Sequence, residues 1–102
     1  MINVKESVYT DKNGVKLYLW DTVGYCLGYI ETVGRIVYNF EDNSISVLSA
    51  DVNIMSHIED VSDLRSLSGM ERCVYSEKLR NLYTSVEENK KLVEFYNKEL
   101  ED

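Results

Sequence analysis

The stretch that decides the fold class is Asp11-Lys-Asn-Gly-Val-Lys-Leu-Tyr-Leu-Trp-Asp-Thr-Val23. Its Asn-Gly pair is a strong signal for a tight hairpin turn, because both residue types tolerate a positive φ. After the turn, Val15, Leu17 and Leu19 alternate with a second row of polar and aromatic residues, as the two faces of a β-strand do. The alternation predicts a strand here but leaves open which of the two rows faces the core.

The same alternation extends in both directions and predicts four or five short strands within residues 1–50. Glycines interrupt these runs, and Glu31-Thr-Val-Gly34 is expected to form a turn between two of them. Short strands with glycines at the bends predict a small antiparallel sheet that curls into an SH3-like or related barrel, with an open meander as the alternative. The alternating runs are residues 2–10, 15–20, 23–29, 36–40 and 44–49.

The hydrophobic period changes after residue 50. Ile54, Ile58, Val61 and Leu64 follow a weak helical spacing, so we expect residues 51–67 to form a short helical or irregular connector. Ser68-Gly-Met-Glu71 then matches a capping box, which opens a long amphipathic helix. We therefore predict an α+β protein with a sheet or barrel over 1–50, the connector over 51–67, and the helix over 68–102.

The predicted C-terminal helix carries apolar residues at the 3,4 spacing of a heptad seam, with Asn89 as its polar member. Such a helix is longer than a barrel built from residues 1–50. Part of the helix must therefore leave the barrel, fold back at a break, or pack against another copy. Of these, we favour pairing with a second copy of the chain, as in a homodimer, or with another helix. Packing onto the chain's own sheet is the alternative. The expected self-association residues are Leu79, Leu82, Val86, Asn89, Val93, Tyr96 and Leu100.

The net charge is −7, and most of it lies in the second half of the chain. Residues 1–50 carry four Lys or Arg and six Asp or Glu, whereas residues 51–102 carry seven and twelve. An acidic surface repels a phosphate backbone, so direct nucleic-acid binding is disfavoured. The same charge suits a basic protein partner, or it serves solubility alone.

The sequence contains no catalytic or metal-binding motif that we can identify. His57 is the only histidine, and no phosphate-binding loop or hydrolase motif occurs. We therefore expect a non-enzymatic protein with no catalytic residue, cofactor or metal. Cys26 and Cys73 are expected to be buried reduced thiols, with one disulfide as the alternative. The lack of a signal peptide or a membrane-spanning apolar run predicts a cytoplasmic protein.

Two kinds of side chain are candidates for contact with a partner. The aromatic candidates share a strand and are of the type with which small barrels bind peptides or single-stranded nucleic acid, although packing beneath the helix is an alternative. The acidic candidates lie in the helical half, where a solvated acidic face is the alternative interpretation. The expected partner-binding residues are Tyr18, Trp20, Asp60, Asp63, Glu87, Glu88 and Glu94.

Residues 10–48 resemble a pattern in YopX-like phage and prophage proteins. In that pattern a D-K-N-G turn leads to an I-Y-x-G-D-x-V strand and then to a G-x-V-x-(F/Y) strand, which matches Asp11–Val23 and Gly34–Tyr38 here. One departure is Trp20, which stands where the pattern has a glycine, and the long C-terminal helix is not part of the pattern. The resemblance implies a small β-barrel and a phage or mobile-element origin, and it carries over no catalytic residue.

These observations predict a non-enzymatic binding protein of phage or mobile-element type. We expect it to self-associate through its helix and to inhibit a host protein, in defence or nucleic-acid processing, as an anti-CRISPR protein does. The net charge permits a surface on which carboxylates take the place of phosphates. The alternative function is a small-barrel nucleic-acid-binding or regulatory accessory module.

Overall fold

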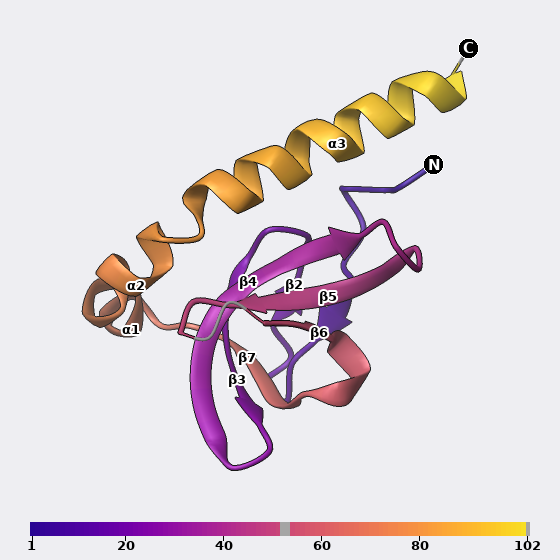
Figure 1. The fold of residues 1–102 in the computed structure, drawn as a ribbon. Helices are drawn as coiled ribbons and strands as arrows, with labels where there is room; N and C mark the ends of the chain where they lie inside the picture. Colours follow the sequence, from indigo (N-terminus) through magenta and orange to yellow (C-terminus); the bar gives the residue numbers. More distant parts are fainter. Residues whose placement is uncertain (52–53, 102) are drawn as a thin grey trace.

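Five antiparallel strands form the main sheet, in the spatial order β6-β5-β4-β3-β7 (Figure 1). The computed structural model describes residues 1–51 and 54–101, and within them β1 and β2 form a separate hairpin. The elements are β1 (Tyr9–Thr10), β2 (Lys16–Leu17), β3 (Thr22–Leu27), β4 (Ile30–Asn39), β5 (Ser44–Ser49), β6 (Met55–His57), the 3₁₀ turn η1 (Ile58–Asp60), β7 (Ser62–Ser66), α1 (Gly69–Val74), α2 (Ser76–Arg80) and α3 (Tyr83–Glu101).

The predicted α+β class with a small antiparallel sheet is confirmed, but the sheet does not close into a barrel. β4 pairs with β3 along residues 30–35 and with β5 along residues 34–39, so its two neighbours overlap only near Gly34. A Cβ atom at Gly34 would overlap the Leu48 carbonyl of β5, which explains the glycine. Among the described residues, β6 and β7 have no strand beyond them in this sheet, and the sheet therefore stays open.

The turn between β3 and β4 lies earlier in the chain than expected. Leu27 pairs with Ile30, which leaves Gly28-Tyr29 as a two-residue loop, and Gly28 has a φ of +61°. Glycine adopts the positive φ that tight hairpin loops require. The turn expected at residues 31–34 is therefore wrong, because these residues lie inside β4.

The connector expected to be short helical or irregular over residues 51–67 instead contains the two strands β6 and β7. β6 pairs with β5 and β7 pairs with β3, so the two strands form opposite edges of the sheet. Only η1, which lies between them in the chain, is helical. Val52 and Asn53 of this connector lie outside the described residues. Pairing with a free sheet edge gives backbone groups hydrogen-bond partners, which outweighs a weak helical spacing of apolar residues. Asp63 has a φ of +58°, at the irregularity where β7 shifts register along β3.

The core contains the row of Leu17 and Leu19, whereas Val15 is exposed and the row of Tyr18 and Trp20 is half-buried. This settles which face of the 15–20 stretch is inward. The strand expected over residues 2–10 is reduced to Tyr9–Thr10. Side chains from the sheet, the N-terminal segment and α3 share the main core, which contains Ile2, Leu17, Leu19, Val23, Tyr25, Ile36, Val47, Leu64 and Val93.

Helix α1 begins with the predicted capping box. The Ser68 Oγ accepts a hydrogen bond from the Glu71 N–H at 3.1 Å, and Glu71 Oε1 accepts one from the Ser68 N–H at 3.2 Å. These bonds satisfy two N–H groups that the first turn of a helix leaves without partners.

The single helix expected over residues 68–102 is wrong, because three helices occupy the region and Asp102 lies outside the described residues. The second break follows α2, where the N–H groups of Asn81 and Leu82 donate to carbonyls three residues back. The tighter turn places Leu82 in a second core cluster with Val37, Leu48 and Val86. Asn81, Tyr83 and Thr84 around the break are weak helix formers, so burial of Leu82 interrupts the helix there at little cost in helix propensity.

Candidate functional site

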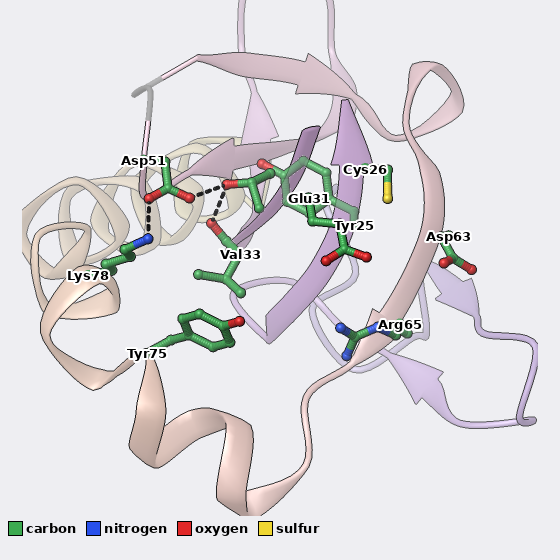
Figure 2. Close-up of a pocket in the computed structure, with 10 residues that line it drawn as sticks. Tyr25, Cys26, Glu31, Val33, Asp51, Asp63, Arg65, Tyr75 and Lys78 are labelled. Atoms are coloured by element: carbon green, nitrogen blue, oxygen red, sulfur yellow. Dashed lines mark hydrogen bonds and ion pairs between the residues drawn. The ribbon is translucent and has the colours of Figure 1, made fainter. Parts of the chain in front are cut away.

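A polar pocket of about 160 Å³ lies between the sheet and the segment around α2 (Figure 2). β3, β4 and β7 supply most of its lining, and Tyr75 and Lys78 approach from the helical side. The residues of this polar pocket are Tyr25, Cys26, Glu31, Thr32, Val33, Asp51, Asp63, Arg65, Tyr75 and Lys78.

A hydrogen-bonded network crosses one wall of the polar pocket. Lys78 Nζ lies 2.8 Å from Asp51 Oδ1, and the Thr32 hydroxyl donates to Asp51 Oδ2 at 2.9 Å. The bond from Lys78, followed by the bond from Thr32, lowers the pKa of Asp51, and Asp51 in turn raises the pKa of Lys78. Tyr25 is buried beside them, and its burial raises its pKa to about 12. The ion pair therefore holds α2 against the sheet at neutral pH.

The second cation of the polar pocket is also paired within the chain. Arg65 Nη1 lies 2.8 Å from Glu71 Oε2, on α1. The Ser68 N–H and then Arg65 lower the pKa of Glu71. Because Lys78 and Arg65 each face a carboxylate already, neither is free to bind an anion in the polar pocket. Its described lining residues include no histidine beside the half-buried Cys26. We interpret the polar pocket as a structural site, where ion pairs hold α1 and α2 against the sheet.

Helix α3 is fastened to β4 by the side-chain amide of Asn89. Its Oδ1 accepts from the Tyr38 N–H at 3.0 Å and from Trp20 Nε1 at 2.9 Å, and its Nδ2 donates to the Tyr38 carbonyl at 2.8 Å. Asn97 pairs with Ile2 in the same manner, with 2.8 Å to the N–H and 2.9 Å to the carbonyl. The two asparagines thus give α3 a fixed position over the sheet and the N-terminal segment.

Trp20 has a φ of +74°, which is rare for a bulky residue. Its main-chain N–H donates to the Ile36 carbonyl at 2.7 Å, and its carbonyl accepts from Arg35 Nε at 2.8 Å. The indole N–H is bound to Asn89, and Lys90 Nζ lies 5.8 Å from the ring centroid. These contacts hold Trp20 in a strained conformation and occupy its ring within the chain.

The C-terminal half of α3 exposes a group of apolar side chains. In Figure 1 this half runs above the β4–β5 hairpin, and its end extends beyond the hairpin toward the C-terminus. Leu92 is 53% exposed, Phe95 63%, Tyr96 37% and Leu100 52%. Phe40, which follows the last residue of β4, lies beside them, because its ring centroid is 6.0 Å from that of Tyr96. We call these five residues the distal α3 surface.

A groove of about 560 Å³ shares Phe40 with the distal α3 surface, and it is lined by the end of β4, the turn that follows, β6 and Asn89 of α3. Tyr38 and Phe40 contribute aromatic rings to it, with their centroids 4.8 Å apart. Glu41 and Asp42 add carboxylates, and His57 Nε2 lies 3.0 Å from Asp42 Oδ2. The groove therefore combines aromatic faces with acidic groups, both of which bind cationic side chains.

The structure divides the seven expected self-association residues between the chain's own core and its surface. Leu82, Val86 and Val93 are buried in the core, at 3%, 0% and 0% exposure. Asn89 binds Tyr38 and Trp20, as described above, and Leu79 is half-buried. Tyr96 and Leu100 are exposed, so they are the part of the seam that a second molecule can reach.

The structure does not bring the seven expected partner-binding residues together. Tyr18 and Trp20 are half-buried, and Asp60 and Asp63 are exposed on η1 and β7. Asp63 forms a 3.2 Å ion pair with Lys12. On α3, Glu87 lies 3.3 Å from Lys90, whereas Glu88 and Glu94 are exposed.

Leu92 and Phe95 are surface residues that the heptad pattern does not include, because both lie outside its 3,4 register. The signal for them is a second row, Glu88-Leu92-Phe95-Glu99, with spacings of four, three and four residues. Both cysteine thiols are free, as expected, but neither is buried: Cys26 is half-buried and Cys73 is exposed.

No family model, curated protein or solved structure matches the chain. No helix of the described residues is long and apolar enough to cross a membrane. Residues 1–51 and 54–101 also bring together no group of three His, Cys, Asp or Glu side chains that could hold a metal ion. A function for this chain must therefore be argued from the distal α3 surface and the groove beside it.

Proposed function

We propose that this chain is a non-enzymatic protein-binding module, and that its partner docks on the distal α3 surface. The observation that carries the proposal is the grouping of Leu92, Phe95, Tyr96 and Leu100 on one rigid helix, all exposed. Scattered apolar residues are common on monomers, but contiguous groups beside a groove are typical of interaction sites. The side chains of Asn89 and Asn97 hold α3, which presents these apolar residues, in a fixed position.

An inhibitory role for this module, of phage or mobile-element type, remains part of the proposal. It is supported by the net charge of −7 and by the resemblance of residues 10–48. A partner enzyme that handles nucleic acid carries a basic surface, which an acidic chain complements. Direct nucleic-acid binding has less support, because the Trp20 ring is already engaged by Asn89 and Lys90 and is not free to stack on a base.

Selection from a random peptide display library tests the proposed surface while leaving the identity of the natural partner open. The selected ligands are then measured against two double variants of the full chain. We expect L92S/F95S to lose binding, because it removes two of the exposed apolar side chains. The matched control is M70S/V74S on α1, where the side chains are 79% and 70% exposed. The proposal would be overturned if the selected ligands bound L92S/F95S as tightly as the wild type and lost affinity only for variants of α1 or the polar pocket.

A further inference from the structure

We propose that the distal α3 surface binds an amphipathic helix of a partner protein that carries Lys or Arg one turn outside its apolar contact residues at both ends. This inference rests on the proposed function and adds the chemistry of the partner. Its starting point is the charge that surrounds the exposed apolar residues of α3.

The most exposed apolar pair on α3 has an acidic residue at each end of its row. Leu92 lies one turn after Glu88, and Phe95 lies one turn before Glu99, so the four side chains form one continuous row. All four are exposed. A helix that packs its own apolar residues on Leu92 and Phe95 therefore brings the residues one turn beyond them to the two carboxylates.

The same row argues against a second copy of this chain as the occupant. An antiparallel copy that pairs Leu92 with Phe95 would place Glu88 against Glu99 at both ends of the contact. A parallel copy would place each glutamate against its own equivalent. Like charges meet in either orientation, and like-charge pairs oppose association.

The flanks of the row extend the argument to the sides of the partner helix. On the hairpin side, the groove presents Glu41 and Asp42 next to the rings of Tyr38 and Phe40. A Lys or Arg side chain that reaches the groove meets an aromatic face and a carboxylate together. On the other flank, Lys91 and Lys98 lie one turn before and one turn after Phe95. The partner therefore carries acidic or uncharged residues on that side, which gives it one orientation.

Three synthetic helical peptides of about 16 residues test the inference with the full chain. They share two leucines spaced to meet Leu92 and Phe95, and they differ only at the two positions one turn outside, which are Lys, Gln or Glu. Fluorescence anisotropy measures their affinities. We expect the Lys peptide to bind the wild type about fourfold more tightly than the Gln peptide, and the Glu peptide to bind weakest, because each of the two exposed ion pairs contributes a factor of about two.

Charge reversal on the protein provides the decisive control. The E88K/E99K variant alters only exposed side chains, so circular dichroism should show an unchanged fold, and we expect its preference to reverse toward the Glu peptide. An unchanged order of affinities, or equal binding of the Lys and Gln peptides, overturns the inference. If that equal binding is lost in L92S/F95S, the proposed surface stands and only the charge inference fails. Binding that survives L92S/F95S removes both.

Light scattering supplies an independent test of the choice between a partner helix and a second copy. We expect the wild type to remain at its monomer mass of 11.8 kDa. The single variant E99K should self-associate more strongly, because an antiparallel copy then pairs Glu88 with the new lysine. A wild-type dimer that E99K dissociates would show that a second copy occupies the surface.

Discussion

The side chain of Asn89 pairs with the main chain of Tyr38 through both of its amide atoms, at 3.0 Å to the N–H and 2.8 Å to the carbonyl. A neighbouring β-strand would satisfy Tyr38 in the same way, so one helical side chain takes the place of a strand along this part of β4. Because Oδ1 also accepts from Trp20 Nε1, Asn89 joins α3, β4 and the Trp20 corner at one point.

We predict that Asn89→Ala lowers the free energy of unfolding by about 2–3 kcal/mol, because it leaves the Tyr38 N–H, the Tyr38 carbonyl and the Trp20 indole without their partner. Urea unfolding followed by circular dichroism measures the change. Lys91→Ala, on the exposed side of α3, is the control and should fall within about 0.5 kcal/mol of the wild type. Equal stability of the two variants would mean that α3 does not depend on the Asn89 clamp.

The strained backbone at Trp20 leads to a second prediction, that the Trp20→Gly variant is more stable than the Trp20→Ala variant. At +74°, an alanine carries a left-handed backbone cost of roughly 1–2 kcal/mol that a glycine avoids. Trp20→Ala and Trp20→Gly lose the same ring and indole contacts, so their difference isolates the backbone. We expect both to be destabilised and Trp20→Gly to be the more stable by about 1 kcal/mol. Alanine equal to or better than glycine would contradict the strain.

Local signals in the sequence were sufficient for parts of the fold. Asn-Gly predicted the first hairpin, in which Gly14 has a φ of +81°. Alternation predicted β5 at Ser44–Ser49, and the capping box predicted the start of α1. In each case the residues that determine the structure are neighbours in the chain, so the pattern is complete within a short window.

Features that depend on distant residues could not be predicted from the sequence. The sheet edges on which β6 and β7 pair are built by other strands, so the pattern of residues 51–67 does not show them. In α3, a 3,4 spacing is the same whether the apolar face meets a second helix or the chain's own sheet. A single Asn such as Asn89 is common in a heptad seam, where it pairs with the facing helix. Here its partner is Tyr38, which is 51 residues away in the chain.

The acid dependence of stability follows from three carboxylates whose pKa the fold lowers. The Val15 N–H, followed by those of Ser66 and Asn13, lowers the pKa of Asp11, and hydrogen bonds also lower the pKa of Asp51 and Glu71. A lowered pKa means that the folded state favours the ionised form. The resulting stabilisation is complete above the ordinary values of 3.8 and 4.5 and is lost as the pH falls through the folded-state values.

We therefore predict that the urea midpoint is nearly constant from pH 7 to about pH 5 and falls steeply below about pH 4. Asp11→Asn cannot titrate at this position, and its amide also opposes the Ser66 N–H. It should be less stable than the wild type at pH 7 and show a shallower fall in acid. Parallel curves for the two proteins would show that Asp11 does not contribute to the acid limb.

The two faces of α3 predict opposite outcomes for the same substitution. Val86 is 0% exposed and lies against Val37 and Leu48. Leu92, which follows it on the same helix but on the other face, is 53% exposed. Val86→Asp buries an unpaired carboxylate and should lower the free energy of unfolding by about 4 kcal/mol or more. Leu92→Asp should stay folded and within about 1 kcal/mol of the wild type, while it weakens ligands selected for the distal α3 surface. Thermal unfolding by circular dichroism and anisotropy with those ligands separate the two effects. A folded Val86→Asp would require α3 to be free of the sheet, and the distal surface would then lose the fixed geometry on which its recognition depends.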